Sequence, residues 1–215
     1  MKNLLVPYYE HPAVRPAEWE ALIAAAPHLH AVVLNPASGP GDRPDPAFAE
    51  AAGRLRAADV RVLGYTDTDY GRRSHADVVR DLSRHRAWYG ADGVFLDQAA
   101  SGTAEFAYYR GLAAVAWGAG CTALVLNHGT VPHPSYARIA DVLVTFEGTW
   151  QTYRGLRAEP WTGRGAQVCH LVYGVPAGVD LAEQAHARGA GLHCAVPGGG
   201  DHPWGTLPHG VRAVS

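Results

Sequence analysis

Eight short apolar runs, each rich in leucine or β-branched residues, recur along the 215 residues of this chain. They are Leu4–Pro7, Ala31–Asn35, Val60–Tyr65, Gly93–Asp97, Ala123–Asn127, Val142–Glu147, Val168–Tyr173 and Leu192–Val196. Most are continuously apolar and do not alternate with polar residues, which is typical of parallel strands covered on both faces. Strands that alternate with helical stretches in this way predict a (β/α)8 barrel, or TIM barrel, in a single domain over residues 1–215.

The stretches between these runs predict five helices and two shorter segments. The helices are expected over Pro16–Ala26, Pro46–Ala58, Ser74–Tyr89, Ala104–Gly118 and Asp180–Arg188. Ser74 and Asp180 are good N-cap residues. The chain is short for a barrel, so we expect incomplete helices after the fifth and sixth runs. A doubly wound open sheet is the alternative, without its nucleotide-binding versions, because no GxGxxG or P-loop follows any run.

Composition is that of an ordinary globular protein, with 47% hydrophobic residues, 18% charged residues and a formal net charge of -2. This balance gives no reason to expect nucleic acid or an anionic membrane as a partner. No apolar run approaches the roughly 18 residues that span a bilayer. The segment Met1–Pro7 is too short for a signal peptide, which favours the cytoplasm. Cys121, Cys169 and Cys194 form no CxxC pair, and we expect them to be buried free thiols.

Two acids stand directly after apolar strands. Gly93–Leu96 leads into Asp97, and Val142–Phe146 leads into Glu147. A carboxylate at such a position gains nothing for folding, because removing it from water is costly. In a barrel, however, the carboxyl ends of the strands form the active site. Two carboxylates placed there indicate glycoside hydrolysis, in which one donates a proton and the other acts as nucleophile or base.

Other polar and aromatic residues are expected at the same mouth of the barrel. The candidates for holding a sugar are Asn35, Tyr65, Asp67, Asp69, Tyr70, Gln98, Asn127, His128, Trp150 and Trp204. The run Thr66–Gly71 is also a good turn sequence, so Asp67 and Asp69 have a structural alternative. Trp150, Tyr153, Trp161 and Trp204 lie in loop-like regions, where aromatic faces could form sugar subsites.

Metal and serine-hydrolase chemistry have little support. The 12 histidines include no HExxH pattern and no zinc-type cluster. His128, His170 and His193 lie in or beside strands, where core or supporting roles are expected. A GxSxG elbow is also absent. Nothing in the sequence calls for a metal or cofactor, and nothing fixes the oligomeric state.

Several motifs resemble the spherulin-4 family (spherulation-specific family 4). They are Val6–Tyr9, Val33–Gly41, Arg61–Tyr65, Thr68–Gly71, Trp88–Tyr89, Asp92–Asp97, Leu126–Pro132, Ala140–Val142, Phe146–Gly148 and Trp204–Pro208. The Asn-Pro-x-Ser-Gly-Pro-Gly stretch at Asn35–Gly41, together with Phe146–Glu147, is the most specific part. The resemblance implies a (β/α)8 barrel related to endo-acting glycoside hydrolases that cut galactosamine-containing polysaccharides such as galactosaminogalactan. It also implies a secreted or surface-attached protein.

The resemblance places the family's acidic site on Asp97 and Glu147. Where the family commonly has Asp-Glu, this chain has Asp97-Gln98. Glutamine can hydrogen-bond a sugar but cannot exchange a proton at neutral pH. Three hypotheses therefore remain: a glycosidase acting on an amino-sugar polysaccharide, a carbohydrate-binding barrel without turnover, and an enzyme of another class on the same fold.

Overall fold

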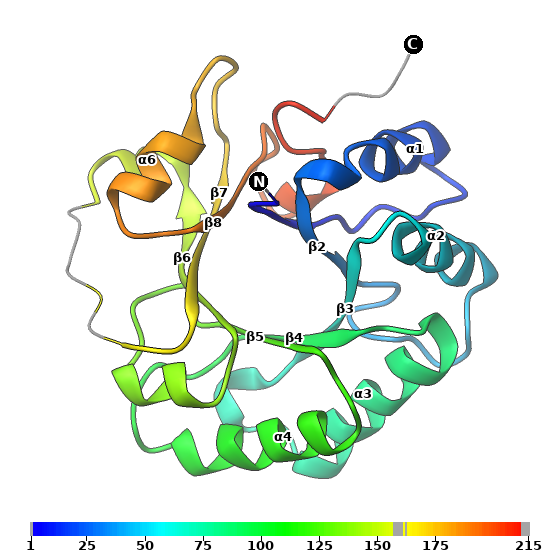
Figure 1. The fold of residues 1–215 in the computed structure, drawn as a ribbon, viewed down its shortest axis with the longest axis vertical. Helices are drawn as coiled ribbons and strands as arrows, with labels where there is room; N and C mark the ends of the chain where they lie inside the picture. The colour runs from blue at the N-terminus through cyan, green and yellow to red at the C-terminus, as the bar shows by residue number, and fades with distance from the viewer. Residues whose placement is uncertain (1, 157–160, 162, 212–215) are drawn as a thin grey trace.

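The computed structural model describes residues 2–156, 161 and 163–211, and within them eight parallel strands close into a barrel (Figure 1). The strands are β1 (Leu4–Pro7), β2 (Leu29–Leu34), β3 (Arg61–Asp67), β4 (Gly93–Asp97), β5 (Ala123–Asn127), β6 (Val142–Thr149), β7 (Gln167–Tyr173) and β8 (Leu192–Ala195). Each pairs with its sequence neighbours, and β1 closes on β8 through Leu4 and His193. The predicted (β/α)8 barrel is confirmed.

Helices surround the strands unevenly, as the short chain predicts. The α-helices are α1 (Pro16–Ala24), α2 (Pro46–Ala57), α3 (His75–Tyr89), α4 (Phe106–Gly118), α5 (Trp150–Arg154) and α6 (Leu181–Ala187). The described residues also include four short 3-10 turns: η1 (Ala26–His28), η2 (Asp69–Gly71), η3 (Pro134–Arg138) and η4 (Pro203–Gly205). Only η3 follows β5, and α5 after β6 is a little over one turn long. None of the helices in the described ranges is long and apolar enough to cross a membrane.

Side-chain caps explain where several helices begin. The Asp180 carboxylate accepts from the Ala182 backbone N–H at 2.9 Å at the start of α6, and Ser74 accepts from Asp77 at 3.2 Å at the start of α3. Both were predicted as caps, and each satisfies an amide that has no partner within its helix. The three cysteines are buried and unpaired, as predicted.

Gly64 in β3 makes room for a histidine that supports the site. A Cβ at Gly64 would lie 2.3 Å from Cγ of His85 in α3. That close packing lets His85 Nε2 contact the Tyr65 carbonyl oxygen at 2.7 Å. Burial lowers the His85 pKa to about 4, so the ring is neutral and Nε2 can donate.

Gly64→Ala and Gly53→Ala are expected to have opposite effects on the free energy of unfolding. The first should destabilise by about 2 kcal/mol, because the barrel must shift to accept the methyl group. Gly53 lies within α2, where a methyl group would meet no neighbouring atom, so alanine there should stabilise by about 0.5–1 kcal/mol. Urea denaturation of both variants measures the difference. Equal stability of the two variants would contradict the packing described for Gly64.

Candidate active site

Strand alternation turns Asp97 towards the inside of the barrel. In β4, Val94 and Leu96 pack outwards in a cluster with residues of α3 and α4, while Phe95 belongs to a different cluster that includes residues of the other strands. Asp97 shares the parity of Phe95 and pairs in register with Asp67 of β3. The last residue of this strand therefore brings its carboxylate to the carboxyl-terminal mouth of the barrel, as the sequence predicts.

A β-bulge turns Glu147 to the same interior. Val144 of β6 pairs with Cys169 of β7, but the next paired residue is Phe146, opposite His170. The extra residue reverses the alternation, so Phe146 packs outwards against Tyr153 in a cluster outside the barrel. Glu147 then takes the inward position. Bulges of this kind occur often beside active sites, where they re-aim a side chain.

Asn127, the last residue of β5, connects the two acids. Its Nδ2 donates to Asp97 Oδ1 at 2.6 Å and also to Glu147 Oε2. Because one nitrogen contacts both carboxylates, their nearest oxygens are no further apart than two hydrogen bonds, roughly 6 Å. Asn127 Oδ1 accepts from the Gly129 backbone N–H at 3.2 Å, which fixes the orientation of the amide.

Each acid also has a donor of its own. Tyr65 Oη donates to Asp97 Oδ2 at 2.8 Å, and Trp204 Nε1 donates to Glu147 Oε1 at 3.1 Å. Tyr9, which follows β1, packs edge-to-face on Tyr65 with ring centroids 5.7 Å apart. Sequence reasoning missed Tyr9 as a site residue. Its position near the carboxyl end of a strand, like those of Asp97 and Asn127, was the available signal.

Burial raises the pKa of both carboxyls, but their surroundings differ. For Asp97, hydrogen bonds from Tyr65, from the Gln98 backbone and from Asn127 oppose the rise, and the negative charge of Asp67 adds a smaller contribution to it. For Glu147, the negative charge of Asp97 adds to the effect of burial, and the donors Asn127 and Trp204 oppose it. Three donors favour the charged form of Asp97, whereas Glu147 has two donors and, after burial, the charge of Asp97 is the largest contribution favouring its protonated form. The pair is thus suited to unequal protonation.

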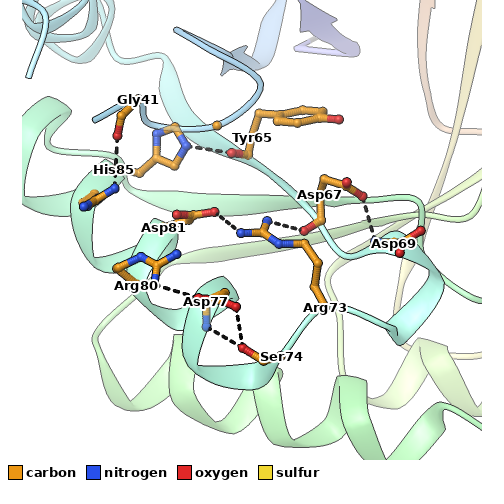
Figure 2. A network of polar contacts seen from close by, with 12 residues as sticks. Gly41, Tyr65, Asp67, Asp69, Arg73, Ser74, Asp77, Arg80, Asp81 and His85 are labelled. Carbon is orange, nitrogen blue, oxygen red and sulfur yellow. Dashed lines mark hydrogen bonds and ion pairs between the residues drawn. The ribbon is translucent and has the colours of Figure 1, made fainter. Parts of the chain in front are cut away.

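A strained loop after β3 forms another part of the mouth (Figure 2). Asp67 Oδ1 accepts from the Asp69 backbone N–H at 2.7 Å, and the Asp67 carbonyl accepts from Arg73, which also pairs with Asp81. Asp69 and Tyr70 both have positive φ, as does Gln98 after β4. The Tyr70 N–H donates to the Gln98 carbonyl at 2.8 Å, which joins the two strained segments. Strain of this kind is concentrated at functional sites.

The structure distributes the remaining candidates unevenly around this mouth. Tyr70 is 50% exposed, whereas Asp69 pairs with Arg72. Asn35 Oδ1 accepts from the Gly39 N–H at 2.8 Å and so holds its own loop. The His128 side chain is buried against Tyr136, with Nδ1 3.0 Å from the Ala100 carbonyl oxygen, away from the two acids. We therefore leave His128 out of the proposed site.

The four aromatics that were expected in loops have different environments. Tyr153 lies in α5 and is fully buried, with its hydroxyl 2.9 Å from His170 Nδ1, so a sugar-facing role for it is wrong. Trp161 packs against clusters on the outside of the barrel. Trp204, in η4, is buried against the site through its bond to Glu147. Trp150 is half-buried at the start of α5. In the ranges described, no group of three His, Cys, Asp or Glu is placed to hold a metal ion.

Comparisons with known proteins identify a family and several solved structures with a similar fold. The family described as Spherulation-specific family 4 matches residues 3–195. Spherulin-4 of Physarum polycephalum is 34% identical over 150 residues, which are 67% of this chain, and the chain spans only 44% of that protein. The crystal structure of Aspergillus clavatus Sph3 in complex with GalNAc is 26% identical, with a TM-score of 0.79, covering 97% of this chain and 93% of that one. A mutant tryptophan synthase α-subunit from Pyrococcus furiosus is similar in fold alone, at 17% identity and a TM-score of 0.58 over 91% and 86% of the two chains.

Proposed function

The chain belongs to spherulation-specific family 4, and we propose that it is a glycoside hydrolase acting on a galactosamine-type polysaccharide. The observation that carries the proposal is the carboxylate pair: Asp97 and Glu147 share one Asn127 amide at the barrel mouth. The likeness to Sph3, whose structure contains GalNAc, supports a sugar of this class as ligand. Aromatic and amide side chains around the acids are of the kinds that bind sugar rings and hydroxyls.

The separation of the acids favours retention of configuration. Retaining glycosidases place their carboxyls about 5–5.5 Å apart, whereas inverting enzymes need about 6.5–9.5 Å to fit a water molecule. The shared amide limits the nearest oxygens to roughly 6 Å, which fits the first class better. Asp97, with more hydrogen-bond donors, attacks the anomeric carbon as a carboxylate. Glu147 gives its proton to the leaving oxygen and later removes one from the incoming water.

Reducing-end release is the direct test of this function. The panel is galactosaminogalactan, a partly deacetylated galactosamine polymer, and chitosan as a glucosamine-based control. We expect release from the galactosamine polymers, with the first product showing the same anomeric configuration as the bond that was cut. No release from any polymer, while binding is still detected, would refute the hydrolase and leave the carbohydrate-binding barrel.

The residue Gln98 favours this second candidate, because it provides no acid at a position where the resemblance to the family implies one. The catalytic pair Asp97 and Glu147 does not include residue 98, so we expect the wild-type protein to cleave the polysaccharide. Gln98→Glu would add a negative charge next to Asp97 and raise its pKa further. The acidic limb of the pH–rate profile should therefore move to higher pH, and the rate at low pH should fall severalfold. A silent wild type that gains activity in Gln98→Glu would support the binding barrel instead.

A further inference from the structure

A groove opens beside the acids at the carboxyl ends of β6 and β7. Its volume is about 490 Å3, and its lining residues are Thr149, Trp150, Gln151, Arg154, Tyr173, Gly174 and Pro176. Thr149 and Tyr173 are paired in register, two residues beyond the pair formed by Glu147 and Leu171. Two strand residues correspond to roughly 7 Å. The groove therefore lies about one sugar ring further out than the carboxylate of Glu147.

Two aromatic rings connect the wall of the groove to the site. Tyr173 packs edge-to-face on Trp204, with centroids 6.0 Å apart, and Trp204 Nε1 donates to Glu147. Tyr173, at the wall of the groove, is therefore linked to Glu147 through a single intervening side chain.

The short helix α5 holds Trp150 at the wall of this groove. Thr149 Oγ1 caps the helix by accepting from the Thr152 N–H at 3.1 Å. Tyr153 is buried beneath it, bonded to His170, and its ring lies 6.2 Å from that of Trp150. Tyr153 therefore anchors the helix, and Trp150 stays half-buried on the side of the groove.

We propose that this groove is a distal subsite for one further pyranose unit of the same polysaccharide chain. The proposal rests on the hydrolase function proposed above. The apolar C–H face of the ring would pack on Trp150 and Tyr173, because both present aromatic surface. Arg154 and Gln151 supply hydrogen-bond donors at the rim for ring hydroxyls or an acetamido oxygen. A pyranose ring can thus contact both the aromatic wall and the polar rim of the groove.

Binding of a graded series of N-acetylgalactosamine oligomers, from the monomer to the hexamer, tests the subsite. The measurement is isothermal titration calorimetry in a Glu147→Gln background, so that no hydrolysis interferes. We expect affinity to rise with length until the groove is filled, and Trp150→Ala to reduce the gain between short and long oligomers about tenfold. Trp117→Ala, which removes an exposed indole on α4 away from the mouth, is the matched control and should leave the gain unchanged.

The outcomes separate the two proposals. Binding of every length with no gain from added units, or the same gain with and without Trp150, would overturn the distal subsite alone. No binding of any oligomer would overturn both the subsite and the function on which it rests. Arg154→Ala gives a second measurement if Trp150→Ala fails to fold, because Arg154 is an exposed residue of α5. It should also reduce the gain from length, and an unchanged gain would contradict the proposed rim.

Discussion

Replacing Glu147 by glutamine is expected to abolish polysaccharide cleavage, with kcat falling by about 10^3–10^4. Glutamine keeps the size of the side chain and can still accept from Trp204 Nε1, but it has no proton to give to a leaving sugar oxygen. General acid catalysis contributes about 10^2–10^4 to rates of this kind. The second step also needs Glu147 as a base, so the loss should lie at the upper end. Reducing-end assays measure it.

The acid role predicts a dependence on the leaving group. An aryl oligosaccharide with an activated phenol needs little protonation, so Glu147→Ala should form the enzyme-bound intermediate from it far faster than from the polymer. Azide can then enter the space that the carboxylate left, and the glycosyl azide should retain the configuration of the substrate. Glu183→Gln, an exposed acid on α6, is the control and should keep full activity. Equal losses on both substrates would argue against Glu147 as the acid.

The wild-type pH profile should show the same assignment. Burial and the charge of Asp97 raise the pKa of Glu147 above its usual value. The acid must be protonated to work, so activity should fall as the pH rises through that raised pKa. The falling limb should therefore lie at a higher pH than an ordinary glutamate would give. A rate that stays constant above this range would rule out Glu147 as the essential acid.

The barrel was predictable from the sequence because its signal is repeated. Because eight apolar runs recur at similar spacing, an error of two residues in the bounds of any one strand does not change the predicted fold. The differences are of that size: β3 continues to Asp67, where the sequence suggested an end at Tyr65, and β6 continues to Thr149. Apolar composition shows that a strand is buried, but hydrogen-bond pairing with neighbours decides where the strand ends.

The site was less predictable, because its contacts depend on register and on distant segments. The orientation of Asp97 follows from simple alternation along β4. The orientation of Glu147 depends on the bulge before it, and no residue in Val142–Phe146 predicts that bulge. The bond from Trp204 to Glu147 joins residues 57 positions apart. Trp150 and Tyr153 are three residues apart in α5, yet Tyr153 is fully buried through its contact with the distant His170, whereas Trp150 is half-buried.

Removing Asp97 is expected to have an effect as large as the loss of Glu147, but with the opposite stereochemical signature. In Asp97→Ala, no carboxylate remains to attack the anomeric carbon, so both the polymer and the activated aryl substrate should lose about 10^3-fold or more in kcat. Azide entering the space on that face attacks the substrate directly. The glycosyl azide should therefore have inverted configuration, and NMR of the product distinguishes the two outcomes. Azide product with retained configuration would exchange the roles of the two acids.

The electrostatic interaction between the two acids gives an independent test of the role of Asp97. Its charge is one cause of the raised pKa of Glu147, so the neutral variant Asp97→Asn should lower that pKa towards its ordinary value. A carbon-13 NMR titration of the Glu147 carboxyl measures the shift without any substrate. The exposed acid Asp42 gives the matched control, because Asp42→Asn removes the same charge outside the site. If the Glu147 pKa is the same in both variants, the two carboxyls do not interact, and a mechanism that depends on their unequal protonation fails.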